Sequence, residues 1–311
     1  MTTALFTHAE CRLHDMGRGH PECPQRLDAI SDHLRATGLD MALSFHDAPL
    51  AEHDDLLLAH TEHYLLELDD KLREVESQGE RVAFDPDTIA CAQTRRAALR
   101  AAGAAVAATD AVHRGECRTA FCAVRPPGHH ATRDAAMGFC FYNNVAVAAR
   151  HALDVLGVER VAIIDFDVHH GNGTEDIIAG DERVLMASFF QHPLYPGSGT
   201  VPKGTNMVNL PVAPYTRGTE LRGLIDEMWM PRLDEFAPRM VFISAGFDAH
   251  REDDLGQLGL VEADYEWITR RIKQIADRHA QGRIVSCLEG GYNLSALARS
   301  VAAHLRVLAD V

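Results

Sequence analysis

The amino-acid sequence predicts an α/β protein in which helices flank one mostly parallel sheet. Short apolar runs rich in β-branched or aromatic residues alternate with longer segments of helical character. The short runs are apolar on both faces, which is typical of parallel strands that helices cover on both sides. No internal repeat and no Pro- or Ser-rich linker interrupts the 311 residues. We therefore expect a single domain over residues 1–311.

Five apolar runs are predicted to be buried strands. They cover residues 121–124, 161–164, 184–187, 240–243 and 284–288. Loops that place glycine beside His, Asp or Tyr follow four of these runs. Because glycine lets the backbone approach a ligand closely, such loops are candidates for a binding site.

Five longer segments are predicted to be helices. They cover residues 94–112, 144–156, 220–236, 262–279 and 295–308. The first is very rich in alanine, whose small side chain suits close helix packing. The alternating order implies right-handed crossovers and one open sheet. In such sheets ligands bind at the carboxyl ends of the strands, so we expect functional residues directly after the strands.

Composition excludes several classes of function. The 45 acidic residues outnumber the 30 basic ones, and the formal charge of −15 disfavours nucleic-acid binding. No apolar run approaches the ~18 residues that span a bilayer, and residues 1–10 have no secretory-signal pattern. Seven cysteines without C-x-x-C spacing suggest reduced thiols and a cytoplasmic location. Homo-oligomer formation stays open.

A metal site is predicted after two of the strands. Histidine is abundant, with 18 residues, and histidine is the commonest metal ligand. Asp167 and His169 are two positions apart, so in an extended segment both side chains point the same way. Asp248 follows another strand and completes a set of three ligands. A divalent ion such as zinc would keep an open coordination position there, as catalytic sites do. A capped turn with a hydrogen-bonded histidine is the simpler alternative for an Asp-x-His segment alone.

Two further elements suit chemistry at a metal. His129 and His130 follow Pro126, Pro127 and Gly128, an irregular loop that can direct both rings into one site. Such a pair suits general acid–base catalysis beside a metal ion. Tyr292 follows two glycines, and its phenol is a good hydrogen-bond donor to a developing oxyanion.

These residues make the family recognisable. The sequence resembles the histone deacetylase and acetylpolyamine amidohydrolase superfamily, on its class II-like, bacterial side. Seven segments carry the resemblance, in order and at similar spacing: residues 19–26, 125–130, 137–144, 165–174, 195–199, 245–248 and 289–293.

The resemblance implies a single-domain arginase/deacetylase fold with a sheet of about eight strands. It also implies Zn²⁺ held by Asp167, His169 and Asp248, which activates water for attack on the amide of an acetylated amine. His130 would be the proton shuttle, with Asn172 as its partner, where some relatives have an aspartate.

Further roles follow from the resemblance. Asp165 would orient His129, which tunes the electrostatics of the site. Tyr292 would hydrogen-bond the oxyanion, and the Gly138 carbonyl would accept a hydrogen bond from the substrate amide. Phe139 and Tyr195 would flank the alkyl chain of the substrate.

A structural K⁺ ion is also implied close to the zinc. Its ligands would be Asp165, the Ser188 hydroxyl and the backbone carbonyls of Asp167, His169 and Phe189.

The substrate is predicted to be acyl-lysine in peptides or proteins. In polyamine-preferring class II relatives an acidic residue precedes the glycine that matches Gly256, and here that position is Leu255. The acidic segment 251–254 is interpreted as a solvated loop. Deacetylation of acetylpolyamines, or of another small acetylated amine, by the same residues is the main alternative.

Two other functions are weighed. A binuclear ureohydrolase would need a second Asp two residues after Asp248, and residue 250 is His. A catalytically silent acyl-lysine binder would have lost a ligand, the histidine base or the tyrosine, and all are present.

Overall fold

A computed structural model describes residues 3–311 of the chain. Within these residues eight strands form one sheet in the order β2-β1-β5-β10-β9-β6-β7-β8, and all neighbouring strands are parallel. The strands are β1 (Thr3–Thr7), β2 (Leu43–Asp47), β5 (Thr119–Cys122), β6 (Val161–Asp165), β7 (Val184–Gln191), β8 (Met207–Val212), β9 (Met240–Ala245) and β10 (Ile284–Leu288). A separate antiparallel pair consists of β3 (Val82–Ala83) and β4 (Ile89–Ala90).

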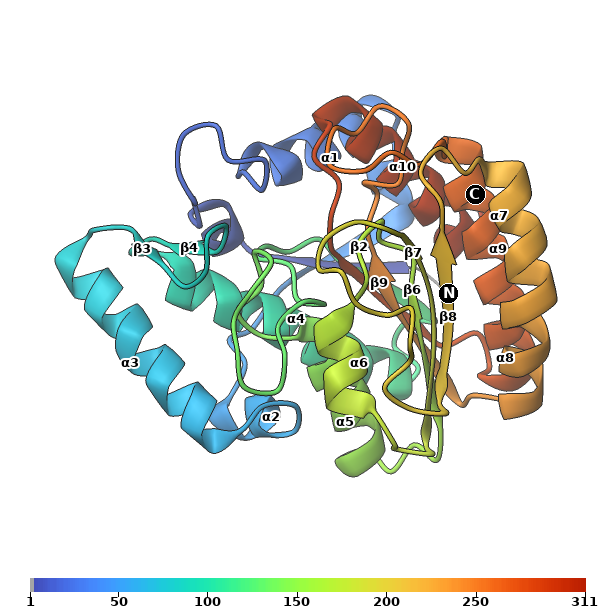
Figure 1. Cartoon of the computed structure of the whole chain (residues 1–311), viewed down its shortest axis with the longest axis horizontal. Coiled ribbons are helices and arrows are strands. Elements are labelled where there is room, and N and C mark those ends of the chain that lie inside the picture. Colours follow the sequence, from blue (N-terminus) through green and yellow to red (C-terminus); the bar gives the residue numbers. More distant parts are fainter. Residues whose placement is uncertain (1–2) are drawn as a thin grey trace.

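Helices cover both faces of the sheet. Figure 1 shows α4, α5 and α6 on one side and α7 to α10 on the other. The helices are α1 (Gln25–Ala36), α2 (His53–Leu57), α3 (Glu62–Gln78), α4 (Thr94–His113), α5 (Asn144–Asp154), α6 (Asn172–Ile178), α7 (Gly218–Leu224), α8 (Met230–Phe236), α9 (Glu262–His279) and α10 (Leu294–Ala309). Because helices cover them, the central strands β5, β6, β9 and β10 are buried at every position.

The alanine-rich helix α4 packs closely on its neighbours, as predicted. Its Ala97, Ala101 and Ala105 are buried, and a Cβ atom on Gly103 would lie 2.3 Å from the Pro49 carbonyl oxygen. A larger side chain at residue 103 would push the helix away from this segment.

The predicted parallel sheet is confirmed, but several element boundaries differ. The strand predicted over 121–124 lies at Thr119–Cys122, and β7 extends four residues further than expected, to Gln191. The single helix predicted over 220–236 is divided by a π-helical turn at Ile225–Trp229. Pro231 follows this turn and cannot donate a backbone hydrogen bond, which favours such an interruption.

The N-terminal third contains elements that the sequence did not indicate. Strands β1 and β2 and helices α1 to α3 all precede residue 94, where the first predicted helix begins. Residues 1 and 2 of the predicted domain lie outside the described residues. No helix within residues 3–311 is long and apolar enough to cross a membrane.

Candidate active site

The predicted site residues meet at the carboxyl end of the sheet. Strands β5, β10, β9 and β6 are neighbours, and the loops that follow them carry the histidine pair, Tyr292 and the predicted metal ligands. A pocket of about 220 Å³ opens there. It is lined by Asp87, His130, Gly138, Phe139, His169, Leu194, Tyr195, Leu255 and Tyr292.

The three predicted zinc ligands lie together and are buried. One donor atom from each of Asp167, His169 and Asp248 lies within 4.8 Å of the others. His169 Nδ1 lies 3.0 Å from Asp167 Oδ1 and 3.2 Å from Asp248 Oδ2. Asp248 Oδ1 accepts a hydrogen bond from the Val168 backbone amide (2.9 Å). Within residues 3–311 no group donates a hydrogen bond to Asp248 Oδ2.

The electrostatics of this cluster suit a cation. Burial and the neighbouring Asp167 raise the pKa of Asp248 to about 7. Two buried carboxylates this close repel each other, and a divalent ion would offset that repulsion. The donor set of two carboxylates and one imidazole is one that zinc accepts. The residues present therefore fit the metal that the sequence predicts.

Two glycines leave space for the carboxylates. A Cβ atom on Gly290 would lie 1.9 Å from Asp248 Oδ2, and one on Gly246 would lie 2.1 Å from Asp167 Oδ2. Any side chain at these positions would displace a predicted ligand. These glycines therefore allow the backbone to lie close to the carboxylates, as the sequence suggested.

The two neighbouring histidines have different partners. His129 Nδ1 lies 2.9 Å from Asp165 Oδ2, and His130 Nδ1 lies 2.7 Å from Asn172 Oδ1. Burial opposes a charge on His129, but Asp165 and Asp167 outweigh it and raise its pKa well above the usual value. Burial, with the positive charge of His129, lowers the pKa of His130 well below the usual value.

Glu289 holds the histidine loop and was missed from the sequence. It is buried at the end of β10, and its Oε2 accepts hydrogen bonds from the backbone amides of Gly128 (2.7 Å) and His129 (3.1 Å). Burial raises the pKa of Glu289 to about 7. Its place before two glycines in a strand-end loop was visible in the sequence, but its burial was not.

Asp253 corrects the interpretation of segment 251–254. It is buried, with 6% of its surface exposed, although the sequence analysis treated this segment as a solvated loop. Its Oδ2 accepts hydrogen bonds from the backbone amides of Tyr292 (2.6 Å) and Asn293 (2.9 Å), and its Oδ1 accepts one from that of Leu255 (3.0 Å). Asp253 thus joins the loop of Leu255 to the loop of Tyr292.

The predicted substrate-binding residues line the pocket. The Phe139 ring lies edge-on to Tyr292, with centroids 5.9 Å apart, and the Tyr195 ring lies edge-on to His130 at 5.2 Å. A Cβ atom on Gly138 would lie 2.5 Å from His130 Cδ2, so glycine leaves room for the histidine.

Asp85 and Asp87 lie near Gly138, and each makes a different contribution to the pocket. Asp85 Oδ2 accepts a hydrogen bond from the Gly138 backbone amide (3.1 Å). Asp87 lines the pocket itself.

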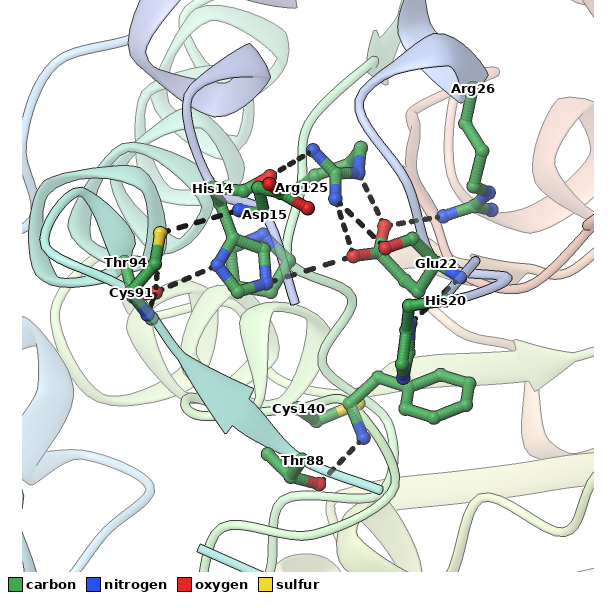
Figure 2. A network of polar contacts seen from close by, with 12 residues as sticks. His14, Asp15, His20, Glu22, Arg26, Thr88, Cys91, Thr94, Arg125 and Cys140 are labelled. Atoms are coloured by element: carbon green, nitrogen blue, oxygen red, sulfur yellow. Dashed lines mark hydrogen bonds and ion pairs between the residues drawn. The ribbon is translucent and has the colours of Figure 1, made fainter. Parts of the chain in front are cut away.

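A buried ionic network lies behind the site. Figure 2 shows Glu22 between Arg125 and Arg26. All three side chains are fully buried, and Arg125 Nη2 lies 2.6 Å from Glu22 Oε2. Both arginines lower the pKa of Glu22 to about 2, against the effect of burial. Arg26 Nε also donates a hydrogen bond to the Gly291 carbonyl (2.7 Å), one residue before Tyr292.

Two of the predicted potassium ligands are neighbours. Asp165 and Ser188 are register partners on β6 and β7, and both are buried. The Ser188 hydroxyl donates a hydrogen bond to Asn209 Oδ1 (3.2 Å), which leaves its lone pairs available to a cation.

Comparison with known proteins identifies the family. The model of the histone deacetylase domain matches residues 20–308. A protein named "Probable deacetylase" from Archaeoglobus fulgidus is 38% identical over 301 residues, which cover 94% of this chain and 82% of that protein. "Polyamine deacetylase HDAC10" from Mus musculus is 36% identical over 326 residues, covering 99% of this chain and 46% of that protein.

A solved structure agrees with the fold. The HDA15 HD domain matches with a TM-score of 0.91 and 31% sequence identity, over 100% of this chain and 90% of that one. The sheet order, the site and these matches lead to one conclusion: the chain belongs to the histone deacetylase family of amide-cleaving hydrolases.

Proposed function

We propose that this chain is a zinc-dependent deacylase that removes acetyl or related acyl groups from the side-chain amine of acyl-lysine in peptides and proteins. One observation carries the proposal. Three buried side chains that could hold a metal ion lie together, and one of them, His169, lines a pocket whose other walls include Phe139, Tyr195 and Leu255. An extended alkyl chain fits such a pocket, with its amide placed beside the ligands.

Asp167, His169 and Asp248 would hold the zinc ion. When bound, zinc polarises the substrate carbonyl and makes water a stronger nucleophile. Three protein ligands leave an open position for these groups.

His130 is the proposed general base. Asn172 Oδ1 can only accept a hydrogen bond, so the neutral His130 carries its proton on Nδ1. Nε2 then has a free lone pair and takes a proton from the attacking water. The same nitrogen returns that proton to the amine as the carbon–nitrogen bond breaks, and the products are acetate and the free amine.

His129 and Tyr292 are proposed to stabilise the negative charge that develops during the reaction. His129, held by Asp165, keeps its proton and stabilises negative charge that develops nearby. Burial and Asp248 raise the pKa of Tyr292 well above its usual value, so the phenol stays neutral. Its hydroxyl would donate a hydrogen bond to the carbonyl oxygen of the substrate. The Gly138 carbonyl would accept a hydrogen bond from the substrate amide.

A structural potassium ion is proposed to bind near the zinc ligands. Asp165, Ser188 and the carbonyls of Asp167, His169 and Phe189 would hold it. Such an ion would stiffen the segment that carries two of the zinc ligands. We also propose a cytoplasmic location, which the seven free thiols support.

A polyamine substrate is the second candidate, and Asp87 favours it. This carboxylate lines the pocket and would attract the cationic tail of an acetylpolyamine. Leu255 favours acyl-lysine, because no carboxylate occupies that position.

Steady-state kinetics of the zinc-loaded protein test this choice. We expect kcat/KM for an acetyl-lysine peptide to exceed that for N-acetylputrescine. The preference should fall in Leu255→Glu, while Leu255→Gln serves as the matched neutral control. A wild-type preference for N-acetylputrescine would overturn the substrate assignment. Turnover of neither compound would count against deacetylation.

A further inference from the structure

A second groove lies beside the catalytic pocket. It measures about 630 Å³ and is lined by Tyr215, Arg217, Arg251 and residues 256–259. Tyr215 and Arg217 follow strand β8 and Arg251 follows β9, at the carboxyl end of the sheet where β8 points in Figure 1. Leu255 lines the catalytic pocket and the next residue lines the groove, so this short segment separates the two.

Backbone hydrogen bonds hold the groove on both sides. The Gly259 amide donates to the Thr216 carbonyl (2.9 Å), and the Arg251 amide donates to the Leu260 carbonyl (2.9 Å). The segment 256–260 is therefore fixed between the two segments that carry the arginines. The positions of both arginines along the groove are set by this backbone, and only their side chains need to be ordered by a ligand.

The two arginines of the groove have no acidic partner. Within residues 3–311 no carboxylate lies within ion-pair distance of Arg217 or Arg251, and no acid lines the groove. Arg222, which is close by in sequence, is held by Asp264 at 2.6 Å. In a chain with a formal charge of −15, two unpaired guanidinium groups on one groove form a local positive site.

The acids nearby do not line the groove, and two of them have other partners. Glu252 lies 2.9 Å from Arg299, and Glu220 accepts a hydrogen bond from the Arg217 backbone amide (2.9 Å). Asp254 is exposed and does not line the groove. A ligand carboxylate would therefore meet two arginine side chains without a competing acid in the groove.

We propose that this groove binds the carboxylate of an acidic residue that flanks the acylated lysine in a peptide substrate. Arginine forms strong, directional hydrogen bonds with carboxylates. With the alkyl chain in the catalytic pocket, the peptide backbone would cross the rim beside Leu255, and a flanking side chain would reach the groove. The proposal rests on the proposed function and specifies the sequence context of its substrate.

Local charge decides this recognition although the whole protein is acidic. At physiological salt, charges more than about 8 Å apart are largely screened. A carboxylate in the groove would therefore interact chiefly with Arg217 and Arg251, which line it, because Glu220 and Glu252 do not line the groove. The interaction should weaken as salt is raised.

Kinetics with paired peptides test the proposal. Each pair has one acetyl-lysine and differs by Asp or Asn at a single position within two residues of it. For at least one position we expect a KM about two- to fivefold lower for the Asp peptide, as for exposed ion pairs, with kcat unchanged. Arg217→Gln combined with Arg251→Gln should remove this difference. Arg306→Gln, at an exposed arginine in a groove between α9 and α10, is the matched control and should retain it.

The outcomes separate the two proposals. Turnover of all peptides with equal KM for Asp and Asn would overturn the groove assignment and leave the deacylase function standing. Inhibition by inorganic phosphate that the double variant relieves, without any flank preference, would assign the groove to free anions and also overturn it. Turnover of no acyl-lysine peptide would overturn the proposed function and the groove with it.

Discussion

His129 and His130 are adjacent in the chain, yet their different partners predict different effects on turnover. Asn172 leaves His130 Nε2 free to move a proton, whereas Asp165 favours a charged His129. His130→Ala should lower kcat by about 10²- to 10⁴-fold, the range for loss of a general acid–base group. His129→Ala should lower it less. Single-turnover rates on an acetyl-lysine peptide would check this order, and a larger loss in His129→Ala would reverse the assignment.

Tyr292 should matter for turnover but not for metal binding. Tyr292 lines the pocket, and its backbone amide donates a hydrogen bond to Asp253 Oδ2. Removing one oxyanion donor costs about 10²- to 10³-fold in kcat, so we expect Tyr292→Phe to lose that much. Its zinc content should equal that of wild type, which mass spectrometry can measure. Near-normal kcat in the variant would exclude Tyr292 as the donor.

Single residues were predictable where a local rule applied. The spacing of Asp167 and His169 predicted that their side chains would meet, and they do, although residues 167–169 form a bend rather than an extended strand. Tyr292 follows two glycines. Asp253 and Glu289 were missed because their role depends on burial against distant segments. A carboxylate in an acidic stretch or a strand-end loop looks the same in sequence whether it is solvated or accepts buried hydrogen bonds.

The buried network of Glu22 connects elements that are far apart in the chain. It joins the loop before α1 to Arg125, which precedes the histidine loop. Glu22→Gln would leave two buried arginines without a charge partner, and breaking a buried pair in this way costs about 3–5 kcal/mol. Urea denaturation should show this loss. Arg12→Gln, which breaks the exposed pair with Asp28, should cost at most about 1 kcal/mol. Equal effects in both variants would contradict this account.

Elements were predictable where apolar runs were uniform. The strand β10 and the helix α9 lie at the residues that the sequence indicated. Edge strand β2 was missed because three of its five residues are exposed, so it lacks a continuous apolar run. The π-helical turn before α8 interrupts a helix whose apolar pattern is continuous, and periodicity alone does not reveal it.

The stability of the whole molecule should depend on pH through buried neutral histidines. His60 Nδ1 donates to the Thr132 carbonyl (2.9 Å), and Nε2 accepts from the Asn143 amide (2.9 Å). Burial lowers the pKa of His60 to about 4 and that of His304 to about 3. Between these values and about 6.5 the unfolded chain binds protons that the folded chain does not. The contribution of these two histidines to the free energy of unfolding should therefore fall as the pH falls from about 6.5 to 4, whereas the raised pKa values of Asp248 and Glu289 act in the opposite direction.

A variant isolates the contribution of His60. At pH 4 the lost stability from this one residue is on the order of 3 kcal/mol, because burial lowers the pKa of His60 from 6.5 to about 4. His60→Gln should be less stable than wild type at pH 7 but show a weaker decline toward pH 4 in urea denaturation. Parallel pH curves for the two proteins would contradict a neutral buried His60.

The architecture of the whole molecule was predictable, because strands that are apolar on both faces require helices on both sides. The meeting of four loops at one edge followed from the same parallel order. The groove of Arg217 and Arg251 was not predictable, since it depends on how the segment after β8 pairs with the segment after β9.

Zinc dependence tests the central claim most directly. The measurement is turnover of an acetyl-lysine peptide by chelator-treated protein as zinc is added back, for wild type and for Asp248→Asn. We predict that chelation abolishes turnover of the wild type and that one equivalent of zinc per chain restores it. Asp248→Asn should regain far less activity at the same zinc concentration. Full turnover by metal-free wild type, or full recovery of Asp248→Asn with one equivalent, would contradict the assignment of this metal centre.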